Sequence, residues 1–193
     1  MNKIKVLALC GKSASGKDTY LKEIMKLTQY PLHEIISCTT RPPRDYEVDG
    51  VNYYFLSNDE FARQIENGEM LEATVFRDWC YGTSKRALKT DKINVGVFNV
   101  DGIDILYDNP LIDLFVVYIY ASDKTRLIRS LTREEDPDVA EIIRRYHADH
   151  EDFEHFYGEN MWIDNDNAPQ SFQDNAKEIV IGACRHWAKE TNA

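Results

Sequence analysis

A glycine-rich segment, residues 11–17, has the composition of a loop that binds phosphate. Its sequence is Gly-Lys-Ser-Ala-Ser-Gly-Lys, and it lies between an apolar run and a helical pattern. In that context the glycines let the backbone curl so that N–H groups point at phosphate oxygens, and the helix start adds positive charge. The ammonium group of Lys17 would reach the β- and γ-phosphates of a nucleotide. The segment therefore predicts a P-loop.

Asp18 follows this lysine, where most P-loops carry the Ser or Thr hydroxyl that ligates magnesium. Its carboxylate could approach magnesium directly or through water, which makes Asp18 the candidate metal ligand. It could instead only complement the positive start of the helix. Both alternatives stay open, and the hydroxyl of Thr19 could serve a nucleotide phosphate.

Two arginines stand three residues apart in the segment Arg41-Pro42-Pro43-Arg44. Guanidinium groups present paired donors that match phosphate oxygens, and the prolines keep the spacing stiff. This pattern predicts a second phosphate-binding site. It is followed in order by Glu-Val-Asp-Gly-Val-Asn-Tyr at 47–53, Glu-Met-Leu-Glu at 69–72 and Tyr-Gly-Thr-Ser at 81–84.

Together with the P-loop, this ordered set resembles the guanylate kinase family over about residues 4–175. The resemblance implies phosphoryl transfer from ATP to GMP or dGMP with Mg²⁺ as cofactor. It implies that ATP is bound by Gly11, Ser13, Ala14, Ser15, Gly16, Lys17, Asp18, Thr19 and Asn165. It implies that the phosphate of GMP is bound by Arg41, Arg44, Tyr53 and Tyr81, and guanine by Ser37, Glu72, Thr83 and Asp101.

The chemistry of guanine supports the role given to Glu72. Guanine presents adjacent N1–H and N2–H donors that one carboxylate can accept together, whereas adenine has an acceptor at N1 that would face the carboxylate repulsively. A lost contact to a buried charged group costs about 1.5–3 kcal/mol, enough to select one base.

Arginines between residues 126 and 152 are the expected lid groups. Arg126, Arg129 and Arg133 lie on one helical face, and the resemblance leaves open whether Arg129 or Arg133 is the first lid arginine. The implied catalytic set is Lys17, Arg41, Arg133, Arg144 and Arg145. Alternatively, the lid arginines balance Glu134, Glu135 and Glu141. The chain also departs from the family at Asn99, where an acid is usual.

Apolar strand patterns at residues 3–10, 34–38, 93–100 and 114–120 alternate with helical patterns at 17–27 and from about 123, 137 and 171. This alternation predicts an α/β fold with a mainly parallel sheet flanked by helices. The resemblance divides residues 1–193 into a P-loop kinase core (1–36, 93–125 and 153–193), an inserted mixed-β nucleoside-monophosphate lobe (37–92) and a helical lid (126–152).

The overall charge is acidic, with 23 Lys and Arg against 33 Asp and Glu, while the first 44 residues hold eight basic and three acidic side chains. This balance argues against nucleic acid or a membrane as partner and favours a focused anion site. Four scattered cysteines and no long apolar run favour a cytoplasmic protein. The sequence leaves the oligomeric state open.

Two other functions stay open. The Gly-Lys-Asp end of the P-loop is similar to that of ribose 1,5-bisphosphate phosphokinase and of some viral deoxynucleotide kinases, so a related kinase with such an acceptor is the alternative. The other is a catalytically silent guanylate-kinase-like interaction module. Such modules lose phosphate-binding groups, whereas Lys17, Arg41 and Arg44 are all present.

Overall fold

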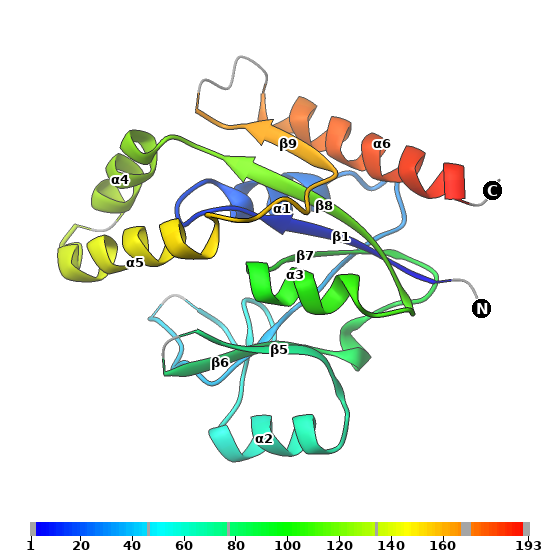
Figure 1. The fold of residues 1–193 in the computed structure, drawn as a ribbon, viewed down its shortest axis with the longest axis horizontal. Helices are drawn as coiled ribbons and strands as arrows, with labels where there is room; N and C mark the ends of the chain where they lie inside the picture. Colours follow the sequence, from blue (N-terminus) through cyan, green and yellow to red (C-terminus); the bar gives the residue numbers. More distant parts are fainter. Residues whose placement is uncertain (1–2, 46, 77, 134, 167–170, 191–193) are drawn as a thin grey trace. The chain divides into compact units, whose positions relative to one another are not determined.

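The structure is a computed structural model that describes residues 3–45, 47–76, 78–133, 135–166 and 171–190 (Figure 1). It has an α/β fold, as the sequence predicts. The strands are β1 (Ile4–Cys10), β2 (Leu32–Glu34), β3 (Cys38–Thr39), β4 (Tyr54–Phe55), β5 (Met70–Phe76), β6 (Trp79–Ser84), β7 (Ile93–Val97), β8 (Ile112–Tyr120) and β9 (Met161–Asp164). The helices are α1 (Lys17–Met25), α2 (Asn58–Glu66), α3 (Val100–Tyr107), α4 (Asp123–Thr132), α5 (Val139–Asp152) and α6 (Phe172–Glu190), with a 3-10 turn at Lys85–Ala87.

The larger sheet has the strand order β2-β7-β1-β8-β9, and β2 pairs with β7, and β8 with β9, in parallel. Residues 6–10 of β1 and 114–119 of β8 are all buried. Strands that are apolar on both faces are typical of a parallel sheet covered by helices. The prediction of a parallel core sheet is therefore confirmed.

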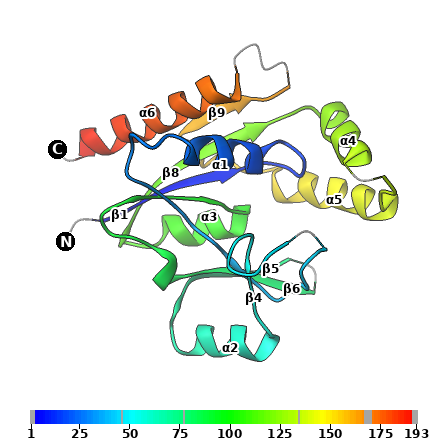
Figure 2. The same ribbon diagram turned by 180° about the vertical axis from the view of Figure 1, so that it is seen from behind.

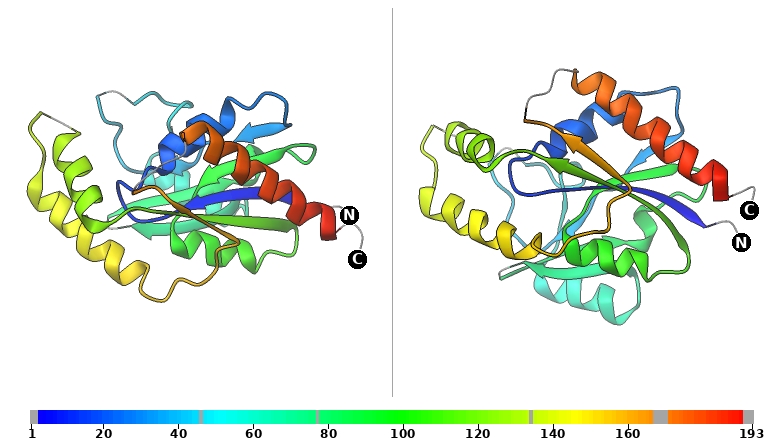
Figure 3. Two further views of the ribbon diagram at one scale, coloured as in Figure 1. Left: turned by 90° about the horizontal axis from the view of Figure 1, so that it is seen from above. Right: turned by 45° about the horizontal axis from the view of Figure 1, so that its top comes forward.

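Helices α1 and α6 pack against one another (Figures 2 and 3). The ring of Tyr20 in α1 lies 5.1 Å from the ring of Phe172 in α6, and the Tyr20 hydroxyl accepts a hydrogen bond of 3.0 Å from Asn175. Helices α4 and α5 likewise pack against each other. Helix α6, the last helix of the chain, thus packs against α1, the helix that follows the P-loop.

The smaller sheet has the order β4-β3-β6-β5 and mixes parallel and antiparallel pairs. Its core is formed by Cys38, Phe61 and Met70. At Gly82 a Cβ atom would lie 2.7 Å from the carbonyl oxygen of Glu72, so only glycine allows β5 and β6 to approach this closely. The mixed-β character predicted for this segment is confirmed.

Helices α2 and α3 were not predicted from the sequence. The lobe at residues 37–92 was predicted as mixed β with no helix named in it, although Ser57 and Glu60 form a capping box at the start of α2. The strand predicted to reach residue 100 ends at Val97, and α3 begins at Val100. Both helices are short, so their apolar periodicity spans few turns and is hard to distinguish from neighbouring strands.

The chain divides into two compact units: residues 1–6, 30–96 and 101–114 form the first, and 7–29, 97–100 and 115–193 form the second. The P-loop and the arginines of α4 and α5 belong to the second unit, whereas Arg41, Arg44, Glu72 and Thr83 belong to the first. No helix among the described residues combines the length and apolar character needed to cross a membrane.

Candidate nucleotide-binding sites

The P-loop connects β1 to α1, and its two glycines are required by its geometry. Gly11 and Gly16 have φ angles of 143° and 107°. A Cβ atom on Gly11 would lie 2.3 Å from the carbonyl oxygen of Ile119, and one on Gly16 would lie 2.4 Å from the amide nitrogen of Asn165. Only glycine tolerates both this conformation and these close approaches. The loop is therefore a tight turn between the sheet and the helix.

Lys17 is the first residue of α1, and its side chain folds back over the loop. Its ammonium nitrogen donates to the carbonyl oxygens of Gly11 at 2.7 Å and Lys12 at 3.0 Å. Burial lowers the pKa of Lys17, while the carboxylates of Asp18 and Asp149 oppose that shift. The structure thus places the ammonium group at the loop, as the sequence predicts.

Asp18 and Thr19 are exposed in the first turn of α1. Among the residues that the structure describes, no group of three His, Cys, Asp or Glu side chains could hold a metal ion. Magnesium, however, is commonly bound by one or two carboxylates together with the phosphates of a substrate. An exposed carboxylate next to Lys17 fits that kind of site.

Arg129 and Asn165 form hydrogen bonds with carbonyl oxygens of the P-loop. One nitrogen of Arg129 lies 3.3 Å from the carbonyl oxygens of both Ala14 and Ser15, and the other donates to the carbonyl of Asn165 at 3.0 Å. The side-chain amide of Asn165 donates to the carbonyl of Ser15 at 2.6 Å. The sequence predicted Asn165 at the ATP site, and the structure brings it to the loop. Of the two candidate lid arginines, Arg129 contacts the loop and Arg133 is exposed at the end of α4.

Arg126 is a P-loop contact that the proposed catalytic set did not include. Its side chain is only 3% exposed. It donates to the carbonyl of Ser13 at 2.9 Å, to Asp123 at 2.8 Å and to Asp149. Its guanidinium lies 5.5 Å from the ring centre of Tyr146. The sequence signal for this contact was the shared helical face of Arg126 and Arg129.

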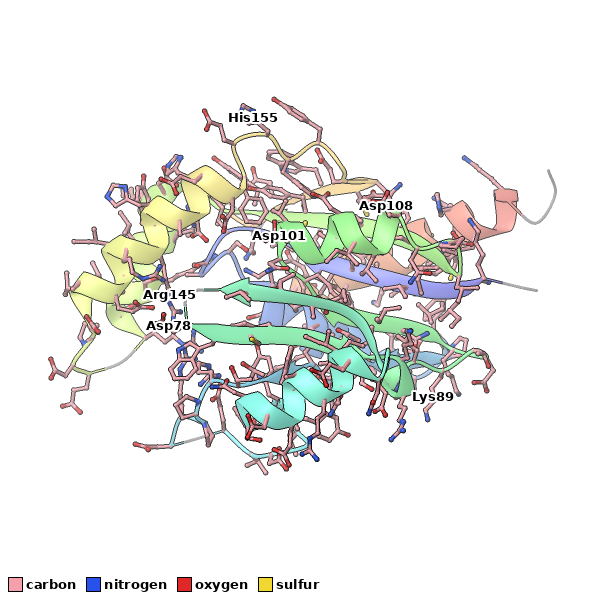
Figure 4. The ribbon with its side chains drawn as sticks, turned by 60° about the horizontal axis from the view of Figure 1, so that its bottom comes forward. Asp78, Lys89, Asp101, Asp108, Arg145 and His155 are labelled. Atoms are coloured by element: carbon pink, nitrogen blue, oxygen red, sulfur yellow. The ribbon has the colours of Figure 1, made fainter. Side chains whose placement is uncertain are left out.

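Arg144 and Arg145 lie on α5, and Figure 4 labels Arg145 there. Both donate to the carboxylate of Glu141, at 3.0 Å and 2.6 Å. These i, i+3 and i, i+4 pairs are the local interactions expected on a helix surface. The catalytic role expected for Arg133, Arg144 and Arg145 remains a prediction.

Arg41 and Arg44, both in the first unit, meet at one carboxylate. Arg41 donates to Glu47 at 2.8 Å, and the backbone N–H of Arg44 donates to the other oxygen of Glu47 at 2.8 Å. The guanidinium of Arg41 lies 5.6 Å from the ring centre of Tyr53, whose ring lies 6.2 Å from that of Tyr81. The four residues expected to bind the acceptor phosphate are thus linked, Arg41 and Arg44 through Glu47, and Tyr53 and Tyr81 through ring contacts that begin at Arg41.

Glu72 lies in β5 directly opposite Thr83 in β6, and both are buried. Burial raises the pKa of Glu72 to about 7, and the neighbouring Thr83 opposes this shift. In its ionised form this buried carboxylate can accept two donors from a ligand. Ser37, whose carbonyl accepts from the Tyr54 N–H at 2.9 Å, lies in the same unit. Asp101 also belongs to this unit and is exposed at the start of α3 (Figure 4); the guanine contacts of Ser37 and Asp101 remain predictions.

Comparisons with known proteins point to one family. The sequence model described as guanylate kinase matches residues 3–180. The guanylate kinase of Campylobacter jejuni (strain RM1221) is 29% identical over 172 residues, covering 87% of this chain and 84% of its own. That of Thermotoga maritima is 32% identical over 139 residues, covering 68% and 66%. The crystal structure of guanylate kinase from Anaplasma phagocytophilum superposes with a TM-score of 0.67 at 20% identity, covering 96% of this chain and 88% of its own.

Proposed function

The chain belongs to the guanylate kinase family, and we propose that it transfers the γ-phosphoryl group of ATP to GMP or dGMP with Mg²⁺ as cofactor. One observation carries the choice of acceptor: the buried Glu72 carboxylate lies in the same compact unit as the Arg41 and Arg44 pair. A carboxylate that accepts two donors and a pair of guanidinium groups match the two ends of GMP. The division into core, lobe and lid predicted from the sequence is part of this proposal.

On the donor side, the P-loop and Lys17 would bind the β- and γ-phosphates of ATP. Lys17 lies at the positive start of α1, where backbone N–H groups and the helix dipole favour anions. Its contacts with the carbonyls of Gly11 and Lys12 hold the ammonium close to the loop. Arg126 and Arg129 reach the same loop and would stabilise charge that develops on the transferred phosphoryl group.

Bound Mg²⁺ would neutralise charge on the β- and γ-phosphates, with Asp18 as the residue of this chain that holds it directly or through water. On the acceptor side, Arg41 and Arg44 would orient the phosphate of GMP for in-line attack. The attacking oxygen belongs to a phosphate that is largely ionised at neutral pH, so the reaction needs no strong general base. Thiols at Cys10, Cys38 and Cys80 that form no disulfide fit the proposed cytoplasmic location.

The role of Asp18 can be tested with two variants. If its carboxylate serves magnesium, Asp18→Ala should raise the magnesium concentration required for half-maximal rate, whereas Asp18→Ser supplies the common hydroxyl ligand and should keep most activity. If Asp18 only complements the helix dipole, Asp18→Ala should cost about 0.3–1 kcal/mol of stability. A magnesium titration of Asp18→Ala that overlays the wild type would remove Asp18 from the metal site.

A coupled assay of ADP release with GMP, dGMP, AMP, UMP and ribose 1,5-bisphosphate as acceptors tests the proposed function. GMP or dGMP should give the highest kcat/KM by a wide margin. A preference for AMP or UMP would contradict the role of Glu72, and a preference for ribose 1,5-bisphosphate would favour the related kinase named above.

A further inference from the structure

Asp149, in the last turns of α5, binds the P-loop from a distance of 136 residues along the chain. One carboxylate oxygen accepts from the backbone N–H of Ser13 at 2.9 Å, and the other from the Ser13 hydroxyl at 3.0 Å. The same carboxylate accepts from Arg126, and both side chains are largely buried. A P-loop N–H, a hydroxyl and a guanidinium are donors that bind a phosphate group.

The contact also limits what Arg126 can do. Its guanidinium has five N–H donors, and three of them point at Ser13, Asp123 and Asp149. Two carboxylates thus share one buried positive charge. Release of one of these carboxylates would leave more of the positive charge of Arg126 to stabilise negative charge on a phosphoryl group. Of the two, Asp149 accepts from the loop residue Ser13 as well as from the arginine, whereas the described hydrogen bonds of Asp123 link it to α4 and α5.

We propose that Asp149 is an internal competitor for the polyphosphate of the nucleotide. A polyphosphate that binds the loop displaces the carboxylate from Ser13, and the same displacement frees Arg126 for the phosphoryl group. Binding of polyphosphate to the loop is therefore coupled to the release of Arg126. The identification of ATP as the natural polyphosphate rests on the proposed function; the competition itself does not.

Calorimetric titration of the full chain with inorganic pyrophosphate, without any acceptor, tests the competition. Asp149→Asn keeps the size of the side chain but removes its charge and turns a donor toward Arg126. The contact of residue 149 with Ser13 and Arg126 is therefore weaker. Pyrophosphate should bind at least about tenfold more tightly, which corresponds to a competent loop populated about one-tenth of the time in the wild type. Unchanged or weaker binding would overturn the proposal.

Asp123→Asn is the matched control, because Asp123 binds Arg126 at 2.8 Å and is not among the acceptors of Ser13. If the competition takes place at the loop, this variant should gain much less affinity than Asp149→Asn. Equal gains would show that only the charge of Arg126 matters and would contradict the proposal.

Hydrogen exchange of the wild type provides a measurement that needs no variant. Pyrophosphate should speed amide exchange in the last turns of α5, since their anchor to Ser13 is lost. Unchanged or slower exchange there would show that Asp149 stays bound to Ser13, which would contradict the proposal. GMP kinase activity combined with failure of these tests would leave the proposed function intact. Tighter pyrophosphate binding by Asp149→Asn, together with a wild type that does not phosphorylate GMP, would support the competition and contradict the proposed function.

Discussion

Lys17→Ala should lower kcat by at least about 10²-fold, comparable to removing one preorganised donor that stabilises a transition state. The ammonium group of Lys17 is held at 2.7 Å and 3.0 Å from two loop carbonyls. Because burial lowers its pKa, the free protein already pays electrostatically for keeping this charge, and bound phosphate would relieve that cost. Steady-state kinetics with GMP and saturating ATP measure the loss.

The control for this experiment is Lys17→Met, which keeps the apolar stem without the charge. Both variants should melt close to the wild-type temperature in the absence of nucleotide, because Lys17 is half-buried and is not a residue of the apolar core. A sharp fall in melting temperature for both would assign Lys17 a structural role in holding the loop.

Glu72→Gln should reduce kcat/KM for GMP by about 2–4 kcal/mol, or roughly 30- to 1,000-fold. The amide keeps the shape and one acceptor but turns an NH₂ donor toward a donor of guanine. Glu69→Gln is a suitable control, since Glu69 lies directly before β5, the strand of Glu72, and its carboxylate pairs with the exposed Arg86 at 3.5 Å. Unchanged GMP kinetics in Glu72→Gln would remove this residue from the guanine site.

The same residue predicts a pH dependence. The pKa of Glu72 is raised to about 7, so the ionised form that accepts the guanine donors is lost as pH falls through about 7. KM for GMP should rise below that pH in the wild type, and this component should vanish in Glu72→Gln, while titration of the GMP phosphate is common to both. A raised carboxyl pKa also means that the folded state binds the proton more tightly. The free energy of unfolding of the free wild type should therefore decrease as pH rises from about 4.5 to 7, and Glu72→Gln should lack that decrease.

Local sequence determined which parts of the fold could be predicted. The P-loop and strands β1 and β8 were found because their apolar runs and glycines are continuous in sequence. Helix α1 is equally short and was predicted from its place after the P-loop, whereas α2 and α3 have no such motif beside them and too few turns to establish a period. The arginine pair at 41 and 44 was predicted because its spacing is short.

Contacts between distant segments could not be predicted in the same way. Ser13 meets Arg126 and Asp149 across 113 and 136 residues, and nothing in the local sequence around Asp149 marks it as a partner of the loop. The pairing of Arg144 and Arg145 with Glu141 was, in contrast, visible as helical spacing. Side-chain chemistry is thus predictable at short range, while the partner of a buried charge depends on the three-dimensional fold.

The most direct measurement follows the phosphoryl group itself. Wild-type protein is incubated with ATP that carries a radioactive γ-phosphate, with magnesium and with equal concentrations of GMP and AMP, and the products are separated. The label should appear in GDP, in an amount equal to the ADP formed, with little in a product of AMP. Label found mainly in inorganic phosphate, or in the product of AMP, would contradict transfer to a guanine nucleotide selected by Glu72.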